Sequence, residues 1–319
     1  MAVIRQAYGE ALAQYGKLHK EVAALDADLA KSTMSCLFRD VCPDRFYQVG
    51  IAESNMAAMA AGMAACGLIP FVHTFAAFIS SLCFLSARSL SGYTKYNVRY
   101  AGTNSGLTGA YDGSTHHSLD DLAVMSSISG MMVLVPSDGT IVNWMVKELI
   151  EHPNGPAYLR LSRVNAPELY AAGENFTLGK AKTLTEGRDV TVIACGMCTG
   201  RAVEAASLLR REGISIQVID MFTINPLDES AIIKAAKETG AIVVAEEHFV
   251  SGGLGTKTAS VLCRNSIALP FAQVGVLDVY TESGSYEDLV KKFHVDTADI
   301  AAAVRKVFAA KKDAIKTSY

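Results

Sequence analysis

The chain has no cluster of basic residues and little charge of either sign. Charged residues make up 19% of its 319 residues, and the formal net charge is -3. A sequence with so few clustered positive charges predicts no basic surface patch that would attract a polyanion. The composition therefore argues against nucleic acid as a partner.

The chain also lacks a secretion signal and a long uninterrupted apolar run. Its first residues, "MAVIRQAYGEALAQYG", are typical of an amphipathic helix with acid and base on its polar face, not of a signal peptide. The most apolar stretch, Met56 to Leu85, is interrupted by Gly62, Gly67, Pro70 and His73. We therefore expect no membrane span and a cytoplasmic protein.

Cysteines are few and scattered. Of the seven, the only closely spaced pair is Cys195 and Cys198 in "ACGMCTG". A zinc site would need a second pair of ligands, which the sequence does not offer. A redox-active pair at a strand-to-helix turn stays open, but buried or incidental thiols in a reducing cytosol are the preferred interpretation.

What the chain does have is a repeated alternation of strand-like and helix-like segments. Strands such as "RFYQVGI" and "YNVRYAGTN" alternate with helices at Glu53 to Cys66 and Gly139 to Glu151. Later, the apolar segments "DVTVIACG", "ISIQVIDM" and "AIVVAEE" are separated by helices at Arg201 to Glu212 and Asp228 to Thr239. This alternation predicts an α/β fold with mainly parallel sheets.

The alternation lapses once, in "VNAPELYAAGENFTLG", which we interpret as a linker with an edge strand. The predicted organisation is a first domain at residues 1–165, a linker at 166–180 and a smaller second domain at 181–319.

One carboxylate is placed unusually. In "VGIAESNMAAMAAG", Glu53 stands at the head of an uncharged run that continues to Arg88. A carboxylate at the edge of a segment built for burial is costly without a partner. The sequence therefore raises the question of what Glu53 faces.

Polar residues gather where the predicted strands of the first domain end. Open α/β sheets bind ligands at the carboxyl ends of their strands. The richest candidate is the loop "TNSGLTGAYDGSTHH", which offers glycine backbone N–H groups, the acid Asp112 and a proton-transfer group at His116 or His117. The same residues are also typical of a hydrophilic turn that ends in a helix-capping Ser118. A ligand-binding loop and a simple turn both stay open.

Two further features are weaker. Phe75 and Phe78 could stack on a flat heterocycle, although aromatics at helical spacing more often belong to a core. The stretch "SGGLGTKTA" is typical of a phosphate-cradling turn before a helix but lacks the full spacing of a nucleotide loop.

Taken together, the motifs resemble a known family. "RFYQVGIAESNMAAMAAG", "PFVHTFAAF", "YDGSTHHSLDDLAVM", "VLVPSDG" and "YLRLSR" resemble the pyrimidine-binding domain of transketolases. "DMFTINPLD", "VVAEEHFVSGGLG" and "FHVDTADIAAAV" resemble the C-terminal domain of that family. The resemblance covers essentially the whole chain and implies two-carbon ketol transfer from a ketose phosphate, or a related anionic ketose, to an aldose.

The Gly-Asp-Gly motif of the family's diphosphate-binding domain is missing. The chain therefore resembles the C-terminal subunit of a split transketolase. The resemblance implies a partner, the N-terminal transketolase subunit, which would hold Mg²⁺ and the diphosphate of thiamine diphosphate. Family precedent suggests an α2β2 heterotetramer.

The resemblance also implies roles at the cofactor. Glu53 would hydrogen-bond N1′ of the aminopyrimidine and so act as a catalytic residue. Phe75 and Phe78 would wall the pyrimidine ring, and Asp28 and Leu29 would lie near the thiazolium.

At the substrate, the resemblance assigns Asp112 to the donor hydroxyl next to the reacting carbon. His116 would contact the C1 hydroxyl and take part in catalysis. Arg5, Ser32 and Arg163 fall where the family binds the terminal phosphate, and two arginines make a specific anion clamp.

The chain departs from the family at Asn104, where many transketolases have a phosphate-contacting His. We hypothesise that Asn104 reshapes this pocket for an unusual anion or sugar, such as a branched sugar phosphate or a sulfonated sugar. Neutral change in a pocket that still holds Arg5 and Arg163 is the alternative.

Three other functions compete with the split transketolase. The beta subunit of a 2-oxo-acid dehydrogenase has the same two domains, and a deoxyxylulose-phosphate synthase fragment is a weaker option. A catalytically inert regulatory subunit would keep the fold without the chemistry.

Overall fold

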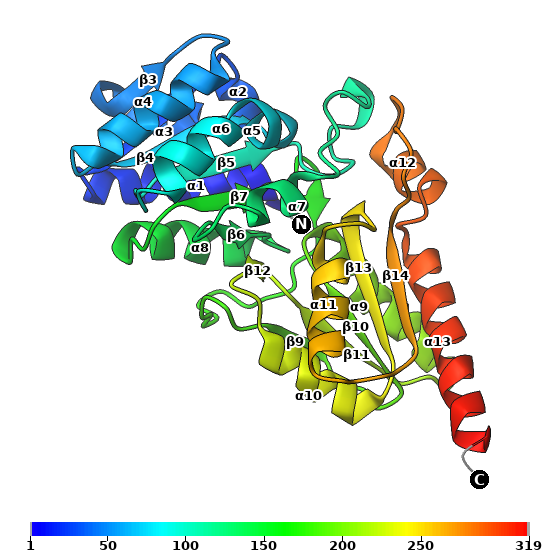
Figure 1. Cartoon of the computed structure of the whole chain (residues 1–319). Coiled ribbons are helices and arrows are strands. Elements are labelled where there is room, and N and C mark those ends of the chain that lie inside the picture. Colours follow the sequence, from blue (N-terminus) through cyan, green and yellow to red (C-terminus); the bar gives the residue numbers. More distant parts are fainter. Residues whose placement is uncertain (1, 318–319) are drawn as a thin grey trace.

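The computed structural model describes residues 2–317, which form two α/β units side by side (Figure 1). Each unit has its own mainly parallel sheet with helices on both faces. The predicted fold class is confirmed. None of the helices within the described residues is long and apolar enough to cross a membrane.

The first sheet has seven strands in the order β12-β6-β7-β5-β4-β2-β3. All neighbours are parallel except β12 and β6. The central strands are buried along their whole length, as expected when helices cover both faces. The strands are β2 (Val22–Asp26), β3 (Phe46–Gln48), β4 (Ile69–Phe75), β5 (Arg99–Thr103), β6 (Met132–Leu134), β7 (Ala157–Arg160) and β12 (Thr223–Asn225).

Helices cover both faces of this sheet. One face packs against α4, α5, η2 and α7, and the other against α1, α3 and α8. The helical elements of this unit are α1 (Ile4–Leu18), α2 (Ala30–Thr33), α3 (Cys36–Val41), η1 (Pro43–Arg45), α4 (Glu53–Ala65), α5 (Ala76–Leu82), α6 (Phe84–Ser86), η2 (Ala87–Gly92), η3 (Ala110–Asp112), α7 (Asp121–Ser126) and α8 (Gly139–Glu151).

The second sheet has five strands in the order β14-β13-β10-β11-β9, with β9 antiparallel at one edge. Helices α9, α12 and α13 cover one face, and α10 and α11 cover the other. Its elements are β9 (Lys182–Thr185), β10 (Val190–Ala194), α9 (Met197–Arg210), β11 (Ile216–Asp220), α10 (Glu229–Thr239), β13 (Ile242–Phe249), α11 (Leu254–Arg264), β14 (Phe271–Val276), α12 (Tyr286–Lys292) and α13 (Thr297–Thr317).

The segment predicted as a linker contains the expected edge strand. β8 (Asn165–Ala166) pairs antiparallel with β1 (Ala2–Val3). The segment between the two units therefore lies against the first strand of the chain. The predicted domain limits themselves, at residues 165 and 181, stay a prediction.

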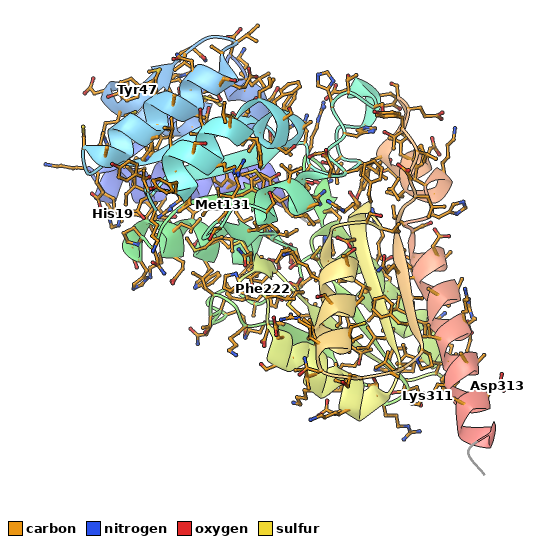
Figure 2. All side chains as sticks on the ribbon, viewed as in Figure 1. His19, Tyr47, Met131, Phe222, Lys311 and Asp313 are labelled. Atoms are coloured by element: carbon orange, nitrogen blue, oxygen red, sulfur yellow. The ribbon has the colours of Figure 1, made fainter. Side chains whose placement is uncertain are left out.

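The two units share more than a linker. β12 comes from the chain after β11, yet it adds an edge strand to the first sheet, where Asn225 Nδ2 donates to the Met131 carbonyl at 2.6 Å. Phe222 lies between the two units and packs edge-on against Trp144 and Phe176 (Figure 2). The sequence pattern did not predict this exchange, because three residues are too short a run to show periodicity.

A buried carboxylate also joins the units. Asp220, at the end of β11, accepts hydrogen bonds from Ser137 Oγ at 2.5 Å, Tyr170 OH at 2.7 Å and Thr199 Oγ1 at 2.9 Å. Burial raises the pKa of Asp220 to about 6, although the three hydroxyl donors oppose that rise.

A buried ion pair ties the first sheet to the second. Arg160, at the end of β7, contacts Asp121 through Nε at 2.7 Å and Nη2 at 3.1 Å. Its Nη2 also donates to the Glu247 carbonyl on β13 at 2.8 Å. Burial alone would lower the pKa of Arg160, but Asp121 raises it above its ordinary value, so the guanidinium stays charged.

We predict that Asp121→Asn lowers the free energy of unfolding by about 3–5 kcal/mol, because it leaves a buried guanidinium without its counter-ion. Urea denaturation measures this loss. The control Glu212→Gln breaks the exposed Arg305–Glu212 pair and should cost about 0–1 kcal/mol. Equal losses from the two substitutions would contradict the assignment of Asp121 as a structural anchor.

Candidate active site

The predicted site residues lie where strands of the first sheet end. Asp28 and Leu29 follow β2, Phe75 ends β4, Asn104 follows β5 and Arg163 follows β7. Because β2, β4, β5 and β7 are parallel neighbours, their carboxyl ends share one edge of the sheet.

Glu53 is the first residue of α4 and is 6% exposed. Its Oε1 accepts a hydrogen bond from Thr74 Oγ1 on β4 at 3.3 Å. The N-terminus of a helix favours negative charge, which offsets part of the cost of burying the carboxylate.

Three aromatic rings form a cluster at the end of β4. The rings of Phe75 and Phe78 stack with centroids 5.7 Å apart and an interplanar angle of 30°. The His116 ring meets both edge-on, with centroids 5.9 Å from Phe75 and 5.3 Å from Phe78. Thr74 and Phe75 are consecutive residues at the end of β4, so the hydrogen-bond donor of Glu53 and the first of these rings come from the same strand end.

These residues fit a flat heteroaromatic ring that carries a basic nitrogen. Phenylalanine faces pack on planar rings, and a nearly buried carboxylate can share a proton with a ring nitrogen. The core interpretation of Phe75 and Phe78 holds only in part, because Phe75 is 8% exposed whereas Phe78 is half-buried.

A second group of residues gathers positive charge. Asp112 Oδ2 accepts from Arg163 Nη1 at 2.9 Å and from Asn104 Nδ2 at 3.3 Å. Arg5 Nη1 donates to the Ser32 carbonyl at 2.6 Å. Burial and the neighbouring Arg163 lower the pKa of Arg5, and Asp112 opposes this. Two guanidinium groups share one carboxylate here, so the group carries net positive charge.

Two buried polar atoms in this group have no hydrogen-bond partner within the described chain. They are Asn104 Oδ1 and Arg5 Nε. Asn104 is fully buried and has a positive φ of 56°, a conformation that Asn tolerates better than most residues. Buried polar groups are normally paired, so each of these atoms keeps capacity for one more hydrogen bond.

Leu29 is positioned by Asp26, and the Asp28 backbone N–H donates to Gln48 Oε1 at 2.7 Å. The Asp26 carboxylate accepts from the Leu29 backbone N–H at 2.6 Å, and from Thr33 and Ser35 hydroxyls at 2.8 Å each. In the described chain no hydrogen bond or ring contact joins the Asp28 or Leu29 side chain to Glu53 or the aromatic rings.

Of the two histidines in the loop, His116 is the one at the aromatic rings. His117 is buried, and its ring nitrogens contact the Ala110 carbonyl at 3.1 Å and Thr281 Oγ1 at 2.7 Å. Burial lowers the pKa of His117. The structure thus places His116 at the aromatic rings, whereas both nitrogens of His117 are engaged by Ala110 and Thr281.

The phosphate-cradling turn is also wrong as an interpretation. The backbone N–H groups of Leu254 and Gly255 donate to the Glu246 carboxylate at 2.8 and 2.7 Å. The protein's own carboxylate thus fills this helix N-terminus. A Cβ at Gly253 would lie 2.2 Å from Glu246 Oε2, which explains the glycine.

Cys195 and Cys198 are free and buried, which confirms the interpretation as buried thiols. Burial raises the pKa of both, to about 12 for Cys198. Across residues 2–317, no group of three or more His, Cys, Asp or Glu side chains lies close enough to hold a metal ion.

The fold and the site define a two-unit α/β protein with a nearly buried carboxylate, a cluster of aromatic rings and two arginines near one aspartate. The family described as "Transketolase, pyrimidine binding domain" matches residues 1–168, and "Transketolase, C-terminal domain" matches residues 179–300. The chain belongs to the transketolase family.

Several relatives of similar length are named as transketolase sections or subunits. A putative transketolase C-terminal section of Methanocaldococcus jannaschii is 36% identical, covering 94% of this chain and 95% of that protein. The 6-deoxy-6-sulfo-D-fructose transketolase subunit SqwH of a Clostridium species is 37% identical, covering 95% of this chain and 94% of that protein. An apulose-4-phosphate transketolase subunit of Phocaeicola vulgatus is 34% identical over 94% and 96%.

A solved structure described as a split gene transketolase, inactive beta4 tetramer, has 40% sequence identity and a TM-score of 0.90, covering 97% of this chain and all of that one. Human transketolase is 37% identical, but the chain spans 48% of its length. The chain fits the C-terminal subunit of a two-component transketolase.

Sequence reasoning missed several residues that shape the site. Asp26 had a weak signal, a strand-end acid followed by Thr33 and Ser35. Thr281 and Ser283 contact the loop around Asp112 from more than 160 residues away, and nothing in the sequence signals that contact.

We predict that Arg163→Ala changes the free energy of unfolding by less than about 1 kcal/mol, because its ion pair with Asp112 is half-exposed. The same substitution should weaken binding of inorganic phosphate by roughly tenfold or more, since a hydrogen bond to a charged group is worth about 1.5–3 kcal/mol. NMR titration of the chain with phosphate measures the affinity. Arg39→Ala, which removes an exposed arginine paired with Asp40, is the control. Unchanged phosphate affinity in Arg163→Ala would contradict the anion clamp.

Proposed function

We propose that this chain supplies half of a transketolase active site and is active only with an N-terminal partner subunit. In this proposal the partner holds the diphosphate of thiamine diphosphate and Mg²⁺, and this chain holds the aminopyrimidine. The observation that carries the proposal is the nearly buried Glu53 carboxylate, whose hydrogen-bond donor Thr74 directly precedes Phe75 in the ring cluster of Phe75, Phe78 and His116.

Each residue of this pocket has a task in the proposal. When bound, thiamine diphosphate supplies the nucleophilic carbon that carries the two-carbon unit. Glu53 shares a proton with a ring nitrogen of the pyrimidine, and Thr74 orients the carboxylate. Phe75 and Phe78 hold the ring and exclude water. Asp28 and Leu29 would lie at the thiazolium end.

The substrate would bind along the second group of residues. The Asp112 carboxylate would accept a hydrogen bond from the donor hydroxyl next to the reacting carbon of the ketose. A ring nitrogen of His116 would contact the C1 hydroxyl. Arg5 and Arg163 would clamp the terminal anion together with Ser32, and their excess positive charge supports this.

Asn104 is proposed to recognise a hydroxyl group. Its Nδ2 already donates to Asp112, so the unpaired Oδ1 needs a donor. A sugar hydroxyl can donate, whereas phosphate and sulfonate oxygens only accept. We propose that Asn104 adapts the pocket to a modified sugar, of the kind named for the relatives that act on 6-deoxy-6-sulfo-D-fructose or apulose 4-phosphate. A preference of the reconstituted enzyme for xylulose 5-phosphate and ribose 5-phosphate over all modified sugars would refute this part.

The partner is proposed to dock around the start of α4. Ile51 and Leu85 are 83% and 72% exposed, and Leu82 is half-exposed. The Leu82 carbonyl accepts from Ser54 Oγ at 2.7 Å, so the end of α5 lies against the start of α4, and Ile51 stands two residues before Glu53. Exposed apolar side chains around a polar site are typical of an interface. An α2β2 heterotetramer in the cytoplasm would complete the assembly.

The matches to transketolase subunits favour this function over a 2-oxo-acid dehydrogenase beta subunit. An inert regulatory subunit is the remaining alternative, and the retained Glu53, Asp112 and His116 speak against it.

We predict that neither this chain nor its N-terminal partner alone transfers a ketol unit, and that their equimolar mixture does so with thiamine diphosphate and Mg²⁺. The physical reason is that each chain holds one half of the cofactor. A coupled assay that follows aldose production measures it. Full activity from this chain alone would refute the half-site proposal.

We also predict that Glu53→Gln lowers turnover of the mixture by about 100-fold or more, because the amide cannot exchange a proton with the ring nitrogen. Glu238→Gln, in an exposed pair with Lys234, should leave turnover unchanged. Near wild-type turnover of Glu53→Gln would remove Glu53 from the chemistry and favour the inert-subunit alternative.

A further inference from the structure

A segment of the second unit lies against the loop that carries Asp112 and His116. The loop after β5 and the loop after β14 lie side by side (Figure 1). Thr281 Oγ1 lies 2.7 Å from His117 Nδ1, and Ser283 Oγ donates to the Tyr111 carbonyl at 2.6 Å. These bonds connect residues more than 160 positions apart.

The chemistry of the partners fixes the direction of the bonds at His117. Its Nε2 lies 3.1 Å from the Ala110 carbonyl, which can only accept, so Nε2 carries the proton. Burial lowers the pKa of His117, although the bond to Ala110 opposes this, and the ring is neutral. Nδ1 is then an acceptor, and the Thr281 hydroxyl must donate to it.

The turn that these bonds hold is strained. Ala110 has a positive φ of 51°, in the left-handed region that alanine rarely adopts, and Gly113 follows at 82°. Such a conformation costs about 1–3 kcal/mol and persists only where surrounding contacts fix it. Between these two residues lies Asp112, which binds Arg163 and Asn104.

The segment offers little else to the fold. Its neighbours Leu277, Val279 and Tyr280 are exposed, Tyr280 by 93%, so apolar burial does not explain its position. Thr281 itself is buried. The segment therefore contributes hydrogen bonds, not apolar contacts, to the first unit, and these bonds hold the turn from Ala110 to Gly113.

We propose that Thr281 and Ser283 are positioning residues for substrate binding. Through them the second unit contributes to the active site. Thr281 acts through His117 on Ala110, and Ser283 acts on Tyr111, so that Asp112 and His116 keep the orientation that receives the ketose. This inference rests on the proposed function for its kinetic part and on the contacts alone for its structural part.

The test compares Thr281→Val, which removes the hydroxyl at nearly constant shape, with Thr281→Ser, which keeps it. In the chain alone, hydrogen exchange of a peptide covering residues 105–117 should accelerate about fivefold to tenfold in Thr281→Val, as expected for the loss of one hydrogen bond. Thr281→Ser should exchange like wild type. The control Thr297→Val removes a hydroxyl bonded to Glu204 elsewhere in the second unit and should leave this peptide unchanged.

In the mixture with the partner, Thr281→Val should raise KM for the ketose donor by about tenfold and change the affinity for thiamine diphosphate much less, because Glu53, Phe75 and Phe78 lie outside the turn and only the His116 ring links it to them. Thr281→Ser should restore KM. Unchanged exchange in Thr281→Val would overturn the inference, and so would faster exchange with an unchanged KM. An inactive wild-type mixture would refute the proposed function instead, and the exchange experiment would still decide the contact.

Discussion

The nearly complete burial of one carboxylate is the constraint on which the site depends. Glu53 stands where α4 begins, and its hydrogen-bond donor at 3.3 Å is Thr74, the residue before Phe75 on β4. A long hydrogen bond and a helix N-terminus offset only part of the cost of removing an ionised group from water. A ring nitrogen that shares its proton would supply the rest, and so the environment of Glu53 points to a cofactor.

The two units depend on each other for the same reason, since polar groups at their junction are buried and must be paired. Arg160 in the first unit donates a hydrogen bond to the Glu247 carbonyl, and Asp220 accepts a hydrogen bond from the Ser137 hydroxyl in the first unit. β12 even completes the first sheet with residues from the second half of the chain. The second unit therefore fixes the carboxyl edge of the first sheet, where the candidate site lies.

The sequence predicted the fold class and most strands and helices, because alternation of apolar segments is a local signal. Gly139–Glu151 matches its predicted helix, whereas α9 begins at Met197, four residues before the predicted Arg201. The strand-end rule pointed to Asn104, Asp112 and Arg163, which the structure joins by hydrogen bonds, whereas only the resemblance pointed to Arg5, which lies in α1. It could not show that Asn104 Oδ1 is unpaired, that His117 faces away from the rings, or that Glu246 fills the helix N-terminus at Leu254. These facts depend on contacts between distant segments, which no local pattern records.

The central claim is that this chain holds only the pyrimidine half of a thiamine diphosphate site. Isothermal titration calorimetry with thiamine diphosphate and Mg²⁺ tests it most directly, on this chain, on the N-terminal partner and on their equimolar mixture. The account predicts tight binding by the mixture, with one cofactor for each pair of chains, and far weaker binding by either chain alone. Equally tight binding by this chain without its partner would contradict the account.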